Sequence, residues 1–341
     1  MKGLTWFSKI IYIINVLAAF LLLLSYILVY VEPKQFSVLS VLSLAVPVLI
    51  IVNLLFLIYW ILRLKKQVMV SAVVLLLGYN FIGSLYQFNG ETPNSHDTTV
   101  ISIMTYNVRI FNNYKWIPSD NVKEDIGKFL NKEQADIIAL QEYPRGNPLI
   151  LEGYNNFNAR YTKKAKGGLV VYAKYPIVNS GSLEFLNTPN NAIYVDLEIQ
   201  QDTIRVYNVH LQSARLDTSV EALEKEGSNL FKRLGSTFKT QQDQAETILK
   251  HVSSCPHPYI ITGDFNNTAF SYVYRQLLGE NLKDSFVESG EGFGRTFNLK
   301  QLPLRIDFVL LHKSMQVKSH KSYNTQLSDH FPVKASFTLH E

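Results

Sequence analysis

Residues 258–266 read Pro258-Tyr-Ile-Ile-Thr-Gly-Asp264-Phe-Asn266, an apolar run that ends in polar residues. Residues 259–261 form a compact apolar run with β-branched residues, which is typical of a buried strand. Alternate residues of an extended chain point to the same side, so Asp264 and Asn266 are expected to face one pocket. That pocket would lie just beyond the C-terminal end of a strand, where open sheets tend to place active sites. The same residues also suit a turn, and the choice depends on the rest of the chain.

The charges of the chain are unevenly distributed. Of its 33 basic and 28 acidic side chains, residues 1–88 hold six basic and one acidic, which leaves 27 of each sign in residues 89–341. The formal excess of +5 therefore belongs to the N-terminal part and does not indicate nucleic-acid binding. The single cysteine, Cys255, excludes an internal disulfide and leaves the compartment open.

Three long apolar segments open the chain, at residues 10–31, 36–62 and 68–88. Each reaches the roughly 20 residues that a helix needs to cross about 30 Å of hydrocarbon. Buried core helices are the alternative, but three such segments in series favour transmembrane helices. A cleaved signal peptide fits poorly, because the first segment is long and lacks a clear cleavage site of small residues. We therefore predict a membrane domain of three transmembrane helices in residues 1–88.

Basic residues indicate the orientation of this domain. They flank the first segment and fill the loop between the second and the third: Lys2, Lys9, Arg63, Lys65 and Lys66. Because positively charged loops stay in the cytoplasm, we predict a multi-pass membrane protein with a cytoplasmic N-terminus. Everything after Phe88 is then expected outside the cytoplasm. Residues 89–97 are polar and are predicted to form a linker.

Residues 98–341 have the composition of a soluble domain. Strands are predicted at residues 100–107, 137–142, 168–173, 193–199, 204–210, 304–311 and 333–339, with the fourth and fifth forming an antiparallel hairpin. Helices are predicted from residue 122, capped by Ser119 or Asp120, within residues 217–252, and at residues 271–278. Many strands with few helices between them predict an antiparallel α+β sandwich.

Eight polar residues lie at or near the ends of these strands: Asn107, Glu142, His210, Asp264, Asn266, Asp307, Asp329 and His330. Each has an ordinary explanation when it is taken alone. His210 could be a satisfied core histidine, and Asp307 could pair with Arg305 or Arg295. The other polar residues could belong to turns or solvated strand ends.

Taken together, the eight residues have a coherent chemistry. Hydrolysis of a phosphodiester needs a hard divalent cation, an activated water and donors for the developing charge. Mg²⁺ takes few carboxylates and keeps several waters, so Glu142 with Asn107 or Asp329 would suffice. A histidine serves as a base near neutral pH when a carboxylate fixes its tautomer.

Six short motifs carry a resemblance to a known family: Thr105-Tyr-Asn107, Leu140-Gln-Glu142, Asn208-Val-His210-Leu, Gly263-Asp264-Phe-Asn266, Arg305-Ile-Asp307-Phe and Ser328-Asp329-His330. In this order they resemble the endonuclease/exonuclease/phosphatase superfamily, which includes deoxyribonuclease I, abasic-site endonucleases, neutral sphingomyelinases and inositol-polyphosphate 5-phosphatases. The resemblance covers residues 98–341. It implies a catalytic domain folded as a four-layer α/β sandwich of two packed sheets, like that of deoxyribonuclease I.

The resemblance also implies roles for the eight residues. Glu142 would be the principal ligand of Mg²⁺, or of Mn²⁺, with Asn107 beside it and Asp329 contributing. His330, held by Asp307, would be the general base or would act through the attacking water. Asp264 would orient or activate the nucleophile, Asn266 would donate to a phosphate oxygen, and His210 would stabilise the phosphate from the other side. The choice between Asp264 and His330 as the base stays open.

Two departures from the family pattern narrow the substrate. Abasic-site enzymes usually carry an acidic residue where this chain has Arg109, and a tyrosine where it has His210. Duplex binding also depends on basic side chains, and residues 89–341 are formally neutral. A repair nuclease is therefore disfavoured. The expected substrate is a phosphodiester or phosphomonoester, either in a lipid headgroup or in nucleic acid outside the cytoplasm.

Two other classes of function compete with a metal-dependent phosphohydrolase. A membrane-anchored binding module that has lost catalysis is one, and the complete set of site residues argues against it. The second competing class is a channel or transporter. This hypothesis is weak because the apolar segments hold no charged residue. The lipid bilayer is the expected partner of residues 1–88, and no protein partner is inferred.

Overall fold

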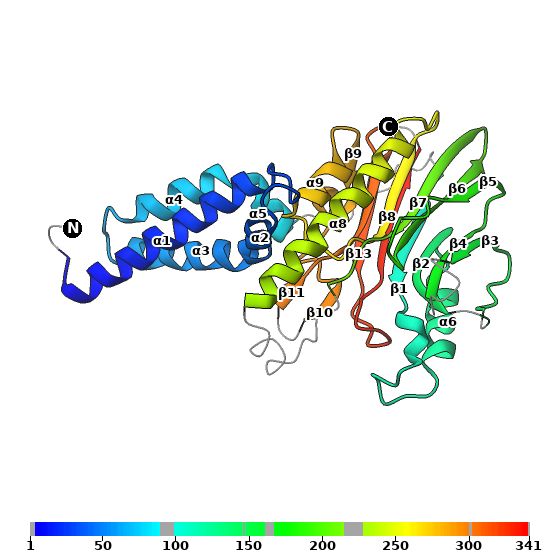
Figure 1. Cartoon of the computed structure of the whole chain (residues 1–341), viewed down its shortest axis with the longest axis horizontal. Helices are drawn as coiled ribbons and strands as arrows, with labels where there is room; N and C mark the ends of the chain where they lie inside the picture. Colours follow the sequence, from blue (N-terminus) through cyan, green and yellow to red (C-terminus); the bar gives the residue numbers. More distant parts are fainter. Residues whose placement is uncertain are drawn as a thin grey trace.

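The computed structural model describes residues 4–88, 99–144, 146, 148–160, 167–214, 228–299 and 302–339. Two parts are seen in Figure 1: a bundle of apolar helices that projects along the long axis, and an α/β sandwich at its end. Lys2 and the predicted linker, residues 89–97, lie outside the described residues.

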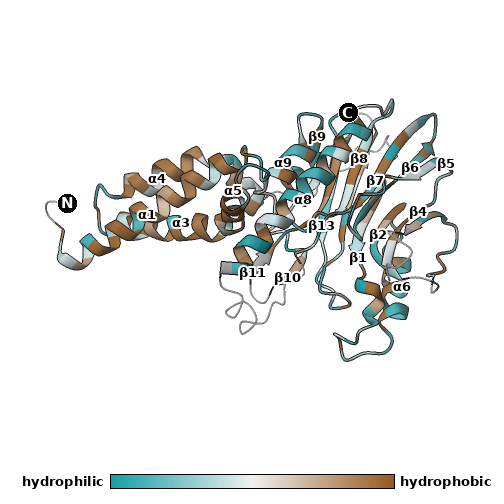
Figure 2. Ribbon diagram, viewed as in Figure 1, coloured by the Kyte–Doolittle hydropathy of each residue, from teal (hydrophilic) through white to brown (hydrophobic). Residues whose placement is uncertain are grey.

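The helical bundle holds two helical segments that are long and apolar enough to cross a membrane. The first is α1 (Trp6–Leu28). The second comprises α2 (Ser37–Ser40), a 3-10 turn (Val41–Ala45) and α3 (Val46–Leu62), which together form one segment of 26 residues. Figure 2 shows these helices as almost uniformly hydrophobic, in contrast to the mixed colouring of the sandwich. The structure thus supports the first two predicted spans.

The third predicted span differs from a straight helix. It consists of α4 (Val68–Leu77) and α5 (Tyr79–Leu85), which meet at an angle of 76°. With 10 residues, α4 is only about 15 Å long, so the segment counts as a span only if both helices are taken together. The bend lies at Gly78, where a Cβ would come within 2.0 Å of the Tyr26 hydroxyl oxygen. The close approach of the Tyr26 ring on α1 therefore requires glycine, and glycine weakens a helix.

Polar side chains tie α4 to the other two helices. The Asn15 amide donates to Ser71 Oγ at 2.7 Å, and the Trp60 indole N–H donates to Asn15 Oδ1 at 3.0 Å. Ser71 in turn donates to Asn53 Oδ1 at 3.4 Å. All four side chains are buried. Hydrogen bonds between helices in an apolar surrounding promote helix association, so α4 is part of the bundle although it is short.

Two six-stranded sheets form the centre of the sandwich. The first has the order β13 (Gln316–Ser322), β14 (Val333–Thr338), β1 (Ile101–Asn107), β2 (Ile137–Pro144), β4 (Gly167–Ala173) and β3 (Asn155–Arg160). The second has the order β5 (Ile177–Ser182), β6 (Asn191–Ile199), β7 (Asp202–His210), β8 (Tyr259–Asp264), β12 (Asp307–His312) and β9 (Leu282–Asp284). A small third sheet pairs β10 (Phe297–Leu299) with β11 (Leu302–Leu304).

Helices cover the outer faces of the two sheets. The inner faces pack against each other through a core of aliphatic side chains that includes Ile103, Val195 and Val309. Against the first sheet packs α6 (Val122–Glu133), and against the second pack α8 (Ser228–Val252) and α9 (Tyr272–Leu278). A short helix, α10 (Ser285–Ser289), follows β9. The fold is therefore an α+β sandwich of four layers.

Most predicted elements agree with the structure, and the differences are local. The hairpin of β6 and β7 is antiparallel, and Ser271 caps α9 by accepting from the Tyr274 N–H. The predicted cap of α6 is wrong: Asn121 precedes the helix, and no side chain caps it. Of the helix predicted within residues 217–252, residues 217–227 lie outside the described part.

Two parallel strand pairs determine where the site lies. In each sheet a central pair, β1 with β2 and β7 with β8, runs parallel, so the prediction of an antiparallel sandwich is wrong for these pairs. The next strands, β14 and β12, run antiparallel to β1 and β8. The C-terminal ends of the four parallel strands and the N-terminal ends of β12 and β14 consequently meet at one edge of the sandwich.

The helical bundle contacts the sandwich at several points. Lys34 forms ion pairs with Asp243 at 2.7 Å and Glu246 at 2.8 Å on α8. At Gly235 of α8, a Cβ would lie 2.6 Å from the Ser37 carbonyl oxygen of α2. The two backbones therefore approach so closely that this helix position requires glycine.

Candidate active site

The eight residues predicted from the sequence lie at this one edge of the sandwich. Asn107, His210 and Asp264 end the parallel strands β1, β7 and β8, and Glu142 lies near the end of β2. Asp307 begins β12, opposite Asp264 in the register of the two strands. The remaining residues, Asn266, Asp329 and His330, occupy the loops that follow β8 and precede β14.

The Asp264 carboxylate is at the centre of the group. Its Oδ2 accepts from Asn107 Nδ2 at 2.9 Å and from Asn266 Nδ2 at 3.2 Å. Two ring nitrogens lie slightly farther away, His210 Nε2 at 3.5 Å and His330 Nε2 at 3.7 Å. A single buried oxygen thus faces four nitrogen atoms from four different segments.

The backbone around Asp264 explains the sequence of its motif. Gly263 has φ +133°, and a Cβ there would lie 2.0 Å from the Val209 carbonyl oxygen of β7. Asn266 has φ +49°, and its N–H donates to Asp264 Oδ1 at 2.8 Å. Its side chain also donates to the Leu211 carbonyl at 3.0 Å. The turn is therefore present, and the Asp264 and Asn266 side chains also lie together, as the alternation of the strand predicted.

Asp307 and His330 form a buried pair. His330 Nδ1 lies 3.0 and 3.2 Å from the two carboxylate oxygens of Asp307. Asp307 therefore pairs with His330, whereas Arg305 pairs with Asp284 at 2.6 Å. Because its Nδ1 is held by Asp307, the ring presents Nε2 to Asp264.

Burial and neighbouring charges shift the pKa values of His330, Asp264 and His210. Burial lowers the pKa of His330, but the carboxylates of Asp307 and Asp264 outweigh it and raise the pKa to about 10. Burial raises the pKa of Asp264 to about 7, against the opposing effect of His330. Burial lowers the pKa of His210 to about 3, so that ring is neutral at physiological pH.

Glu142 lies beside this centre on an irregular part of β2. The register with β4 shifts between Leu140 and Tyr143, and Glu142 has φ +49°. Its Oε1 lies 3.5 Å from Asn107 Nδ2 and 3.9 Å from His210 Nε2. Burial raises the pKa of the Glu142 carboxyl, and the charge on His330 opposes this increase. The bulge therefore turns a partly exposed carboxylate toward the site.

Asp329 is engaged with a cation. Its Oδ2 forms an ion pair with Arg109 at 2.9 Å, and Ser328 Oγ donates to its Oδ1 at 3.2 Å. The Arg109 guanidinium stacks on the ring of Trp116 at 3.8 Å. Arg109, which the sequence marked only as a departure from a family pattern, thus lies at the rim of the site.

One group of side chains and one further carboxylate are candidate ligands for a divalent cation. Asp264, Asp307 and His330 each offer a ligand atom, and these atoms lie within 4.8 Å of one another. Glu142 is the second candidate, and its carboxylate is the type of ligand that Mg²⁺ prefers. Asn107 directs its amide nitrogen to Glu142 and Asp264, and its oxygen accepts from the Arg109 N–H at 3.0 Å. In this arrangement Asn107 is a donor to the carboxylates.

Sequence reasoning missed the residues that support the site from behind. Gln141 donates to Asn208 Oδ1 at 2.7 Å, and Asn208 donates to the Leu140 and Val170 carbonyls, each at 2.9 Å. These bonds join the two sheets directly behind Glu142 and His210. Thr296 Oγ1 accepts from the N–H groups of Ile306 and Asp307. Gln141 and Asn208 are part of the quoted motifs, whereas no local pattern distinguishes Thr296.

Comparison with protein families gives two matches. The Endonuclease/Exonuclease/phosphatase family matches residues 104–330, a range that includes all eight site residues. A second family, Domain of unknown function (DUF8431), matches residues 8–85, which form the helical bundle. Comparison with curated proteins finds no match.

Several solved structures share the fold. An endonuclease/exonuclease/phosphatase from Bacteroides vulgatus is 20% identical, with a TM-score of 0.55 over 71% of this chain and 99% of its own. A mannosyl-6-phosphatase from Bacteroides thetaiotaomicron is 19% identical, with a TM-score of 0.54 over 70% and 99%. The human Nocturnin catalytic domain, with a bound sulfate anion, is 18% identical, with a TM-score of 0.51 over 72% and 98%.

Proposed function

Since the chain belongs to the Endonuclease/Exonuclease/phosphatase family, we propose that it is a membrane-anchored phosphoester hydrolase that depends on a divalent cation. The observation that carries this proposal is the arrangement of Asp307, His330 and Asp264. Asp307 holds Nδ1 of the buried His330 ring, and Nε2 of the same ring lies 3.7 Å from the Asp264 carboxylate. Such a unit moves or holds protons next to a reacting phosphate.

Glu142 is the residue that would hold Mg²⁺, or Mn²⁺ in its place, with Asn107 and Asp329 close by. When bound, such an ion neutralises charge on the phosphate and lowers the pKa of a coordinated water. Side chains of the protein supply the other interactions with the phosphate. Neutral His210 offers a hydrogen bond to a phosphate oxygen, and Arg109 supplies positive charge at the rim. The Asn266 amide would exchange its bond to Asp264 or Leu211 for a phosphate oxygen when the substrate binds.

Of the two candidate bases, the electrostatics favour Asp264. His330 has a pKa of about 10, so it is protonated at neutral pH and suits a donor to the phosphate or to the leaving oxygen. Asp264 has a pKa of about 7, which is suited to taking a proton from the attacking water near neutrality. The alternative is that His330 is the base, as the family resemblance implies. Activity would then fall as the pH drops through the pKa of His330, whereas a protonated donor loses activity as the pH rises.

A lipid phosphodiester is the second candidate for the substrate, beside a soluble phosphoester. Ion pairs and close backbone contacts hold the sandwich against the apolar bundle, and this contact would keep the catalytic domain beside the bilayer. The charge pattern supports an extracytoplasmic domain. The start of α1 and the α3–α4 loop lie at the end of the bundle far from the sandwich (Figure 1). These segments hold the basic residues Lys9, Arg63 and Lys65.

The test is an assay of the purified full-length protein in detergent with four substrates: a bis(p-nitrophenyl) phosphodiester, p-nitrophenyl phosphate, sphingomyelin and plasmid DNA. Each substrate is measured after metal removal by EDTA and after addition of Mg²⁺ or Mn²⁺. We expect hydrolysis of at least one substrate only when metal is present, and its loss in Glu142→Gln. The control is Glu152→Gln, which neutralises an exposed carboxylate elsewhere. A folded protein that hydrolyses none of them would favour the binding module instead.

A further inference from the structure

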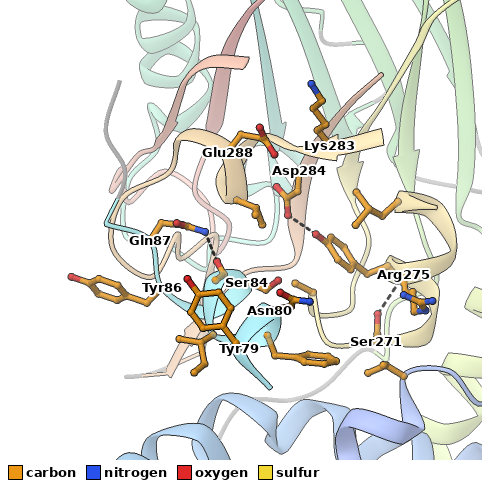
Figure 3. Close-up of a pocket in the computed structure, with 18 of the residues that line it drawn as sticks. Tyr79, Asn80, Ser84, Tyr86, Gln87, Ser271, Arg275, Lys283, Asp284 and Glu288 are labelled. Carbon is orange, nitrogen blue, oxygen red and sulfur yellow. Dashed lines mark hydrogen bonds between the residues drawn. The ribbon is translucent and has the colours of Figure 1, made fainter. Parts of the chain in front are cut away.

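A cavity of about 740 Å³ lies between the helical bundle and the sandwich, away from the candidate active site. Its walls come from the end of α1, from α5, from α9 and from the β9–α10 segment, and none of the eight site residues lines it. In Figure 3 the α5 residues Tyr79, Asn80 and Ser84 lie on one side, and Ser271 and Arg275 lie on the other. This volume is typical of a small-molecule site.

The lining of the cavity is amphipathic. Aromatic and aliphatic side chains, among them Tyr30, Phe81 and Leu278, lie beside charged ones. Of the charged residues, Asp284 is neutralised by its 2.6 Å ion pair with Arg305 and by the Tyr274 hydroxyl, which donates to it at 2.6 Å. The remaining charged residues are Arg275, Lys283 and Glu288, which leaves one surplus positive charge. The ligand that fits is therefore an amphiphile with an anionic group.

An exposed apolar stripe leads from the bundle to this cavity. Phe20, Leu23, Ile27 and Tyr30 follow helical spacing along α1 and its end, and all four are exposed. Tyr30 is the last residue of the stripe, and it lines the cavity. The exposed Arg275 guanidinium lies 3.9 Å from the centre of the Tyr30 ring. Apolar surface and cationic group thus meet at the end of a candidate transmembrane helix, where the headgroups of a bilayer would be.

We propose that this cavity is a phospholipid-binding site. The phosphate is bound by Arg275, the headgroup enters between α5 and α9, and an acyl chain lies along the α1 stripe. Guanidinium groups bind phosphate through two parallel hydrogen bonds. The cavity is too small for a whole phospholipid, so the chains remain in the bilayer while the headgroup occupies the protein.

Two residues that line the cavity also bind Arg305. Its guanidinium contacts Asp284 and donates to the Ser84 carbonyl of α5 at 3.2 Å. Arg305 also packs against the rings of Phe286 and Phe308. A headgroup between Ser84 and Asp284 therefore contacts both partners of Arg305. Arg305 lies two residues before Asp307, the first residue of β12.

Binding is tested on the full-length protein in phosphatidylcholine nanodiscs that contain a photoactivatable phosphatidylcholine with its reactive group near the ester end of an acyl chain. Labelled peptides are identified by mass spectrometry. We expect labelling of residues 271–288. In Arg275→Gln it should decrease about tenfold or more, because the loss of even one of the two charge-assisted hydrogen bonds predicts about tenfold. Lys128→Gln, which removes an exposed charge on α6, should leave the labelling unchanged.

A second variant tests the cavity without removing a charge. At Gly83 a Cβ has room, since its nearest neighbour is Gln87 Nε2 at 3.4 Å. Gly83→Leu should reduce the labelling of residues 271–288 and leave the labelling of α3 as it is. If both Arg275→Gln and Gly83→Leu label like the wild type, the lipid is only annular and the proposal is overturned.

The labelling requires no hydrolysis, so it tests the phospholipid-binding site independently of the proposed function. Glu142→Gln protein should label like the wild type even if no substrate is ever found. The link through Arg305 does rest on the proposed function. For it, we expect faster hydrolysis of the soluble phosphodiester in nanodiscs than in lipid-free detergent, with a smaller gain in Arg275→Gln. Equal gains in both proteins would overturn that link.

Discussion

Replacing Asp307 by asparagine tests the centre of the proposed mechanism. The carboxylate lies 3.0 Å from His330 Nδ1, and it is the foremost of the charges that raise the pKa of that imidazole. Burial lowers this pKa, but Asp307, Asp264 and Asp329 together outweigh that effect and raise it from 6.5 to about 10. The substitution keeps the size of the side chain, but it removes the charge and allows an amide N–H to face the ring.

The expected loss in kcat is about 10²–10⁴-fold, where the upper value is that of the analogous change in a serine protease triad. Asp307→Asn, His330→Ala and the double variant should fall to a similar residual rate, because residues that act as a unit lose their function only once. Thermal unfolding of each variant serves as the control for folding. If the loss in kcat of the double variant equals the product of the two single losses, Asp307 and His330 do not act as a unit.

The pH dependence of the same variants separates the two candidate bases. If His330 acts in its protonated form, activity is lost as the pH rises through the pKa of His330. Asp307→Asn lowers that pKa, so the basic limb of kcat should move to lower pH. If His330 acts as the neutral base, activity instead falls as the pH drops through its pKa, and the variant should extend activity toward acid pH. A profile of kcat between about pH 5 and pH 10, measured at saturating metal, decides between them.

Three further predictions concern the metal, the topology and the bundle. Glu142→Gln should lower activity about 10²-fold or more at limiting Mg²⁺ with folding intact; full activity there would remove Glu142 from the site. A reporter fused after Phe88 should be active only outside the cytoplasm, and activity only inside would refute the orientation. Asn15→Leu removes the hydrogen bonds to Ser71 and Trp60 and should destabilise the bundle by about 1 kcal/mol. Its denaturation in detergent, compared with that of the exposed Leu17→Ala variant, measures this effect.

The outline of the fold was accessible from the sequence because its signals are local. Long apolar runs and alternating strands each follow from the immediate neighbours of the residues concerned. The order of six motifs was enough to predict the family and the eight site residues. The structure brings all eight to one edge, and the roles of each remain proposals.

Other features depend on partners that are distant in the chain. Gly78 breaks the third apolar segment because the Tyr26 ring, 52 positions earlier, occupies the space of a side chain. Arg305 was a candidate partner of Asp307 because the two are close in the sequence. It binds Asp284 and the Ser84 carbonyl instead, and Asp307 pairs with His330. No pattern in the sequence shows which of several carboxylates lies against a given cation.

The sequence by itself determined the order of the elements, the charge asymmetry and the residue types of the site, since these depend on local propensity and composition. Only the tertiary structure decided that Asp264 faces four nitrogens, that Asp329 is held by Arg109, and that a cavity separates α5 from α9. The physical reason is that pKa values and cavities depend on burial and on distances of a few ångströms. Chain packing sets those distances, and neighbours in the sequence do not.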